Sequence, residues 1–479
     1  MDARNRPRLP RAGNEPGAGS RIVHYVLPGG ARLILEEVPY TRSVALGVWV
    51  KAGSRVEPEG QNGIAHLCEH MVFRGTARRS AQRLAEEMDD MGGEFNAVTG
   101  REFTTFFAHV LDQRFAQAMD LLGDMVLHAA MQGDELERER GVVLEEIKMY
   151  DDDAGAVAEE MAAGVFWDGH PLGRPVEGTS DSVRRLTLSD LREFYRRHYY
   201  PGNMVVAIAG NIEPLQAYRA AVRAFGDGPA DGDTVVPAPV EVPVPTRDDG
   251  DGLQAPASLW ESPAPRAAGR RQVTRVKSTE QLHMCVVADG LPVAHRDSYT
   301  WQVLTSVLGG GNSSRLFRRI RDELGLAYAV STYPAALTDT GYTATYVGVE
   351  PDAAEAALEV IVEEMARLCR EEPGEAELAR AREQLKTGLV LSLESLSARM
   401  TMLGNALAGY GPLLPLDEAL RRIDAVSARD VVRLARHLFR PEVVTMAAVG
   451  PNGDFPDVRA VAARFLKGCR GVSGQEEAS

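Results

Sequence analysis

The pattern of hydrophobic and polar positions predicts short strands that alternate with helices in the first half of the chain. Two apolar runs flank Pro28-Gly29-Gly30, as in a β-hairpin, and alternating or β-branched runs indicate further strands. Apolar residues at helical spacing indicate amphipathic helices between them. The strands are expected over residues 23–37, as the hairpin, 43–52 and 102–110, and the helices over 63–73, 80–91 and from residue 112 onward.

The strongest organisational signal is an internal repeat. A helix, a proline break and a buried strand that ends in glycine recur 240 positions later in the chain. The matching residues are Asp190, Pro201 and Gly210 in the first copy and Asp430, Pro441 and Gly450 in the second. The sequence therefore predicts an α+β chain built from two homologous α/β domains.

Changes in composition divide the chain further. Residues 1–20 carry arginines among prolines and glycines, without the apolar core of a secretory signal, and are expected to be a disordered extension. Residues 21–226 form the first predicted domain and residues 272–470 the second. Residues 227–271, rich in Pro, Gly and Asp, are expected to be an extended linker, and residues 471–479 a polar tail.

The residues that indicate chemistry lie in the helix expected over 63–73. His66 and His70 are four residues apart, so both imidazoles lie on one face of a helix and can bind one metal ion. Glu69 lies beside them, close enough to act as a general base without being a ligand. A helix that carries these residues by chance is the alternative, and the site needs a third ligand.

A charged, amphipathic run over residues 134–147 offers that ligand. Glu139 and Glu146 are seven residues apart and therefore share one face of the expected helix. Glu146 could complete a site of two histidines and one glutamate, and Glu139 could support it from behind the ligands. A glutamate-rich helix alone is more often a solvated surface. Beside the two histidines, metal binding is the favoured interpretation.

Composition limits the classes of function. The net charge of −15 argues against a general nucleic-acid or anionic-membrane surface. No segment reaches the apolar length that is needed to cross a bilayer. The four cysteines are scattered and have no paired spacing, which is typical of reduced thiols. We therefore expect a cytoplasmic protein.

The motif from His66 to His70, followed by Glu146, resembles the inverted zinc motif of the inverzincin peptidases. This is the family of pitrilysin, insulin-degrading enzyme and mitochondrial processing peptidase, and the resemblance covers about residues 21–470. It implies mostly antiparallel sheets with helices packed on them, arranged as one half of a clamshell, and one Zn²⁺ per chain. The implied roles are zinc ligand for His66, His70 and Glu146, general base for Glu69 and supporting acid for Glu139.

The resemblance assigns further residues to the substrate. Arg321 and Tyr328 have the seven-residue spacing of an arginine–tyrosine pair in the family, and their donors suit a peptide carbonyl and its oxyanion. In isolation, an exposed arginine and a core tyrosine would be the simpler interpretation. The family also pairs a strand edge with an extended substrate through backbone hydrogen bonds. The residues of that edge in this chain are Phe95, Asn96 and Ala97.

The resemblance therefore implies a zinc-dependent endopeptidase that cleaves peptides or unfolded segments. Long members carry four α/β units, whereas this chain has two, which implies a homodimer, as in half-length bacterial members, or a heterodimer with a metal-free paralogue. Ser306 and Gly310 stand 240 positions after the two histidines, so the metal site is not repeated. A non-catalytic or partner-dependent subunit, or a peptide-binding member of the same family, is the alternative.

Overall fold

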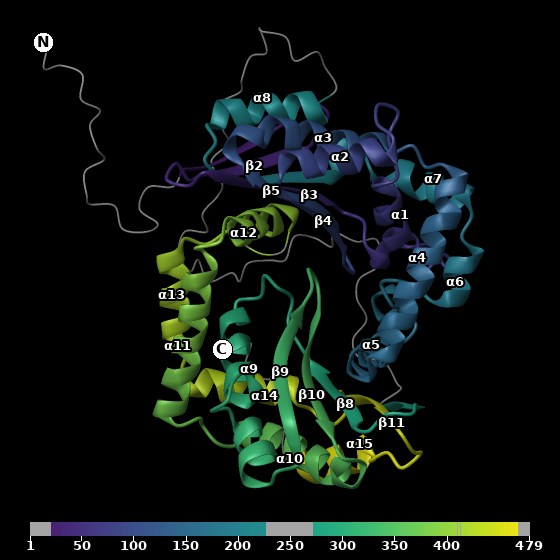
Figure 1. Ribbon diagram of the computed structural model, residues 1–479. Helices are drawn as coiled ribbons and strands as arrows, with labels where there is room; N and C mark the ends of the chain where they lie inside the picture. The colour runs from purple at the N-terminus through teal and green to yellow at the C-terminus, as the bar shows by residue number, and fades with distance from the viewer. Residues whose placement is uncertain (1–20, 227–271, 410, 412, 468–479) are drawn as a thin grey trace, which may run out of the picture.

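The computed structural model describes residues 21–226, 272–409, 411 and 413–467. The predicted extension, linker and tail lie outside these described residues. Figure 1 shows two β-sheets, one in the upper and one in the lower part of the view, joined by columns of helices on either side. Each sheet therefore belongs to one half of the chain.

The first sheet has six strands in the order β1-β2-β6-β3-β5-β4. β2 and β6 are parallel neighbours, and every other neighbouring pair is antiparallel. The predicted hairpin is formed by β1 and β2. The strands are β1 (Arg21–Val26), β2 (Arg32–Glu37), β3 (Ser43–Val50), β4 (Glu94–Thr99), β5 (Thr104–Leu111) and β6 (Met204–Gly210).

The strand predicted over 102–110 begins two residues later than expected. The amide of Gly100 donates to the carbonyl of Phe103, which closes a turn between β4 and β5. Glu102 lies in this turn and is fully buried. The strand was predicted from its β-branched and aromatic residues. That composition does not reveal that the Glu102 carboxylate binds a segment distant in the sequence.

The second sheet repeats the first. Its order is β7-β11-β8-β10-β9, with β7 and β11 parallel and the other neighbours antiparallel. Shifted by 240 residues, β2, β6, β3, β5 and β4 fall close to these five strands in the same order, so the predicted α+β fold of two homologous, mostly antiparallel units is confirmed. The strands are β7 (Gln272–Val276), β8 (Leu282–Asp289), β9 (Ala327–Ala336), β10 (Gly341–Val349) and β11 (Thr445–Gly450).

Helices cover both sheets, and none of the helices described is long and apolar enough to cross a bilayer. In the first half they are α1 (Ile64–Val72), α2 (Ala81–Met91), α3 (Phe115–His128), α4 (Gly133–Asp152), α5 (Ala154–Phe166), α6 (Ser180–Arg185), α7 (Leu188–His198) and α8 (Pro214–Phe225). In the second half they are α9 (Ser298–Gly309), a π-helix (Phe317–Glu323), α10 (Ala354–Leu368), α11 (Glu375–Ser392), α12 (Leu396–Ala408), α13 (Leu416–Ala425), α14 (Ala428–Leu438) and α15 (Val458–Phe465).

The two halves exchange one helix each. α5 of the first half packs on β8 and β11, and Ala158 and Ala162 lie in the same apolar cluster as Val287 of the second sheet. α12 of the second half packs on β2, β3 and β6, where Met400 meets Trp49 in a shared cluster. Figure 1 shows α12 beneath the first sheet and α5 reaching the second. Separating the halves would therefore expose apolar surface on both sheets.

The contact of α12 with the first sheet is very close. A Cβ atom added at Gly404 would fall inside the van der Waals envelope of the Trp49 ring. The Trp49 indole N–H also donates to Asn405 Oδ1 at 3.0 Å. Glycine at position 404 is therefore what lets the helix backbone approach the tryptophan.

We expect Gly404→Ala to lower the free energy of unfolding by about 1–3 kcal/mol, because the added methyl group overpacks this contact. Urea unfolding followed by circular dichroism measures the effect. Gly388→Ala on α11 is the matched control, since a Cβ atom there meets nothing within 4 Å. That change should stabilise the protein by about 0.5–1 kcal/mol. Equal stability of the two variants would contradict the close packing.

Candidate metal centre

Helices α1 and α4 bring the three predicted ligands together. Nε2 of His70 lies 3.3 Å from Oε2 of Glu146, and Nε2 of His66 lies 3.8 Å from the same oxygen. The three ligand atoms all lie within 4.8 Å of one another. Zinc bonds of about 2.0–2.1 Å in tetrahedral geometry separate ligand atoms by about 3.3 Å. The donor set and its spacing therefore fit a zinc ion.

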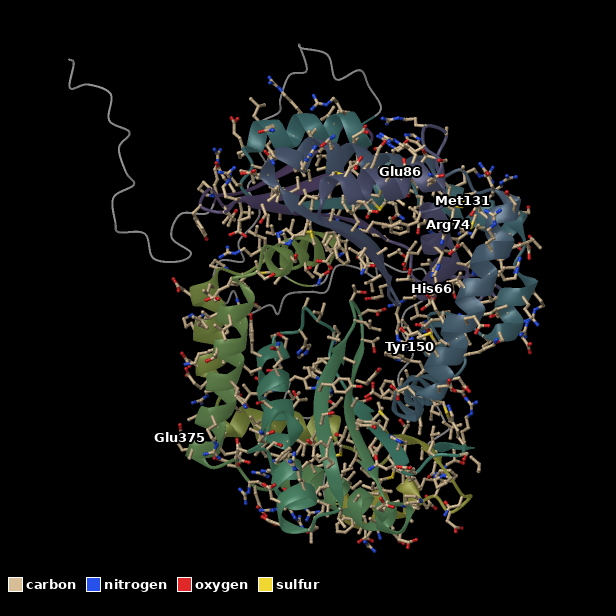
Figure 2. The ribbon with its side chains drawn as sticks, in the orientation of Figure 1. His66, Arg74, Glu86, Met131, Tyr150 and Glu375 are labelled. Carbon is tan, nitrogen blue, oxygen red and sulfur yellow. The ribbon has the colours of Figure 1, made fainter. Side chains whose placement is uncertain are left out.

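The apolar face of each helix determines where the ligands point. Leu67 and Met71 of α1 are buried in the core on the face of the first sheet opposite α12, which leaves His66 and His70 on the half-buried side. Val143 of α4 is buried in the same core and turns the neighbouring glutamates toward α1. Figure 2 shows His66 in the region between the two sheets, close to α4.

Glu139 supports His70 from behind. Its Oε2 lies 3.0 Å from Nδ1 of His70, and its Oε1 forms an ion pair of 2.6 Å with Arg74. The Glu139 side chain is only 3% exposed, so it is fixed in place. A carboxylate on Nδ1 leaves Nε2 of the imidazole free to bind a metal. Arg74 was not predicted from the sequence, because it lies beyond the end of α1 and its role is visible only from its contact with Glu139.

His66 has no such support. Its Nδ1 atom is buried and has no hydrogen-bond partner among the described residues. Its ring packs edge-on against the His70 ring, with the ring centres 4.7 Å apart. The orientation of His66 therefore depends on the position of the α1 backbone.

Glu69 points toward the end of β4. The Thr99 hydroxyl donates to Glu69 Oε2 at 2.6 Å. Burial raises the pKa of Glu69, helped by the charge of Glu146 and opposed by Thr99 and His70. A raised pKa suits a carboxylate that must accept a proton near neutral pH. Thr99 was also missed from the sequence, because its partner is 30 positions away.

The charges of the site favour a cation. Burial lowers the pKa of His66 to about 4, with a further contribution from His70, so this imidazole is neutral near pH 7. Burial also acts to lower the pKa of His70, but Glu139, Glu146 and Glu69 outweigh it and raise the value. The group of carboxylates thus stabilises positive charge at the point where the two imidazoles meet.

The residues predicted to bind substrate lie on an edge strand. β4 is the last strand of the first sheet, and Phe95 and Ala97 pack with their side chains against the first core. Asn96 is exposed, and its Oδ1 accepts from the amide of Ala97 at 2.8 Å. Two of the three side chains are thus used in packing. What β4 leaves accessible for pairing with an added strand is mainly its backbone edge.

Arg321 and Tyr328 lie together in the second half of the chain. The Arg321 guanidinium stacks on the rings of Phe317 and Tyr328, 4.8 and 4.7 Å from their centres. Tyr328 is 78% exposed near the start of β9. The tip of the β9–β10 hairpin, beyond the other end of this strand, contacts the first half through Asp339. Tyr328 therefore lies roughly 30 Å from Asp339 along the strand.

Two family models match the chain. A model described as insulinase, peptidase family M16, matches residues 32–180, and the model of the peptidase M16 inactive domain matches residues 185–385. The chain belongs to the M16 peptidase family. The resemblance inferred from the zinc motif is thereby confirmed. The second model begins at residue 185, within the first half of the chain.

Relatives of this M16 chain are named as zinc proteases. An uncharacterized zinc protease of Bacillus subtilis is 36% identical over 91% of this chain and 100% of its own length. Another from Streptomyces coelicolor is 35% identical over 92% of each chain. These names support a metalloprotease that uses zinc.

Solved structures share the M16 fold. A protease from Helicobacter pylori aligns with a TM-score of 0.79 at 22% identity, over 90% of this chain and 100% of its own. A peptidase M16 inactive domain from Pseudomonas fluorescens aligns with a TM-score of 0.77 at 18% identity, over 91% and 100%. At these identities the likeness concerns the fold alone.

We expect Glu139→Gln to weaken zinc binding about 10- to 100-fold, because His70 loses the carboxylate that orients it. Competition with a chromogenic chelator measures the dissociation constant. Glu137→Gln is the matched control, since Glu137 lies on the same helix, is exposed and pairs with Arg140. Equal affinities of the two variants would show that Glu139 does not support the site.

Proposed function

We propose that this chain is a zinc-dependent endopeptidase that cleaves peptides or extended polypeptide segments. The observation that carries the proposal is the convergence of His66, His70 and Glu146, with Glu69 beside them. These three residues would hold one Zn²⁺, which supplies a Lewis acid and makes a water molecule more acidic when it is bound. Membership of the M16 family and the names of the relatives support the same conclusion.

Glu69 is the general base in this proposal. Its raised pKa and its fixed position on Thr99 suit it to take a proton from the attacking water and to return it to the leaving amine. Thr99 is the last residue of β4. A peptide that pairs with the edge of β4 through its backbone is thereby guided toward Glu69.

Arg321 and Tyr328 would hold a peptide carbonyl and stabilise the oxyanion. They lie near the start of β9, whereas the hairpin contacts the first half of its own chain at Asp339, beyond the other end of this strand, and Tyr328 is exposed. This placement supports a dimer in which they serve the metal centre of a second copy. We propose a homodimer, because one chain carries both sets of residues. A heterodimer with a metal-free paralogue is the alternative.

We also propose a cytoplasmic location. Cys68 and Cys285 are unpaired and buried. They lie in separate apolar clusters, where they act as small apolar residues. Buried, unpaired thiols are typical of reducing compartments.

Glu69→Gln should keep the zinc and lower the rate of peptide cleavage about 10²- to 10⁴-fold, because the general base is lost. Zinc content by mass spectrometry and cleavage of a quenched peptide library measure the two effects. Glu59→Gln, an exposed glutamate before α1, is the control and should behave like the wild type. Zinc without cleavage in all the proteins would instead favour a partner-dependent or peptide-binding subunit.

A mixture of two inactive variants tests the homodimer. Glu69→Gln lacks the base, and Arg321→Ala lacks the carbonyl-binding group, so each alone should be inactive. After mixing and subunit exchange, half of the dimers are mixed and each has one intact site, which should restore about a quarter of the wild-type activity. Native mass spectrometry confirms the exchange. No recovery in exchanged dimers would contradict a shared site.

A further inference from the structure

The turn Ser54–Val56 and the residue after it connect two distant features of the molecule. One is the hairpin β9–β10 of the second half, and the other is the first turn of α1, the helix of His66. Arg55 faces the hairpin and Glu57 faces the helix. Both side chains are buried, at 5% and 4% exposure. This turn is therefore placed to transmit the position of one feature to the other.

Arg55 binds the tip of the β9–β10 hairpin. Its guanidinium forms two hydrogen bonds with the carboxylate of Asp339, at 2.7 and 2.6 Å, and one with Glu102 at 2.8 Å. Glu102 accepts in turn from the amide and hydroxyl of Thr338, at 3.0 and 2.6 Å. Glu102 and Thr338 lie in the equivalent hairpin turns of the two repeats. The tips of the two repeated hairpins thus meet around one buried guanidinium.

The backbone of the turn is also fixed. The amides of Ser54 and Arg55 donate to the carbonyls of Gly100 and Arg101, in the same β4–β5 turn that holds Glu102. A Cβ atom at Gly53 would collide with this turn. A shift of the hairpin tips is therefore passed to the backbone at residues 54–57.

Glu57 caps the metal helix from outside it. Its carboxylate accepts from the amides of Gly63, at 3.1 Å, and Ala65, at 3.0 Å, and from the side chain of Asn62 at 2.8 Å. The residue at the N-cap position is Gly63, which has no side chain to perform this function. A buried carboxylate here satisfies free amides and stabilises the positive end of the helix dipole.

Ala65 directly precedes His66. Nδ1 of His66 has no partner among the described residues, so no hydrogen bond from behind fixes the direction of this imidazole as Glu139 fixes that of His70. The first turn of α1 must therefore position it. His70 differs, since Glu139 holds it independently of the helix start.

We propose that the β9–β10 hairpin positions the metal helix through Arg55 and Glu57, so that the second half of each chain sets the geometry of the metal site in its own first half. Arg55 and Glu57 are positioning residues, because neither contacts a ligand. This inference rests on the proposed zinc site. It assigns to the second half a role within one chain, separate from the role of Arg321 and Tyr328 in a dimer.

The test compares Asp339→Asn, Glu57→Gln and Asp297→Asn in the full chain. Asp297 is the matched control: it also forms a two-bond pair with an arginine, Arg433, in the second half, and its side chain is 13% exposed against 19% for Asp339. Zinc affinity is measured by chelator competition, and ligand geometry by the visible absorption spectrum of the Co²⁺-substituted protein. Thermal unfolding of the metal-free protein reports general stability.

We expect zinc affinity to fall about tenfold in Glu57→Gln and about threefold in Asp339→Asn. Mutating a group that contacts a metal ligand directly lowers affinity by about 10- to 100-fold, and these two residues act less directly. The Co²⁺ spectrum should change in both variants and stay as in the wild type in Asp297→Asn. If Glu57→Gln does not fold, the affinity and spectrum of Asp339→Asn decide.

Three results would overturn the inference. Wild-type affinity and spectrum in both variants, with zinc bound by all the proteins, would refute it and leave the proposed function intact. An equal loss of affinity in Asp339→Asn and Asp297→Asn, in step with thermal stability, would show general destabilisation instead. Absence of zinc binding in the wild type would refute the proposed function together with it.

Discussion

The reciprocal exchange of α5 and α12 is the packing constraint on which the rest of the molecule depends. α5 follows α4 after one residue, Asp153, whose carboxylate caps α5 at Gly155 and Ala156. Burial of α5 on the second sheet therefore fixes the end of α4, the helix of Glu146. Arg275 of β7 adds a two-bond ion pair to Asp151 at the same end. The ligand supplied by the first half is thus held by the second.

The other ligand helix is held to the second half by charge. α1 is capped by Glu57, which lies two residues after Arg55 and its pair with Asp339. One ligand helix is therefore anchored by apolar burial and the other by a buried ionic cluster. Metal sites require ligand atoms to be placed within a few tenths of an ångström. Because α1 and α4 are both anchored to the second half, their relative position is better fixed than that of two independent surface helices would be.

The fold and the convergence of the three candidate ligands were predictable because their signals are local or periodic. The 240-residue repeat indicated two equivalent sheets, and the spacing of His66, His70 and Glu146 placed three donors on two helix faces. The helix exchange was not predictable, because the sheet that α5 or α12 covers depends on tertiary packing and not on a pattern within either helix. Thr99 and Arg74 were missed for the same reason, because each is recognisable only from the atom that it contacts.

The repeat also explains why the second half could change without losing its fold. Ser306 and Gly310 stand where the first half has His66 and His70, yet all five shared strands remain in order. The second sheet provides the surface on which α5 is buried, and its hairpin tip provides the carboxylate that pairs with Arg55. The candidate metal ligands are a few side chains, whereas the architecture depends on buried contacts shared between the halves. A half without the two histidines therefore still helps to fix the helix that carries them in the other half.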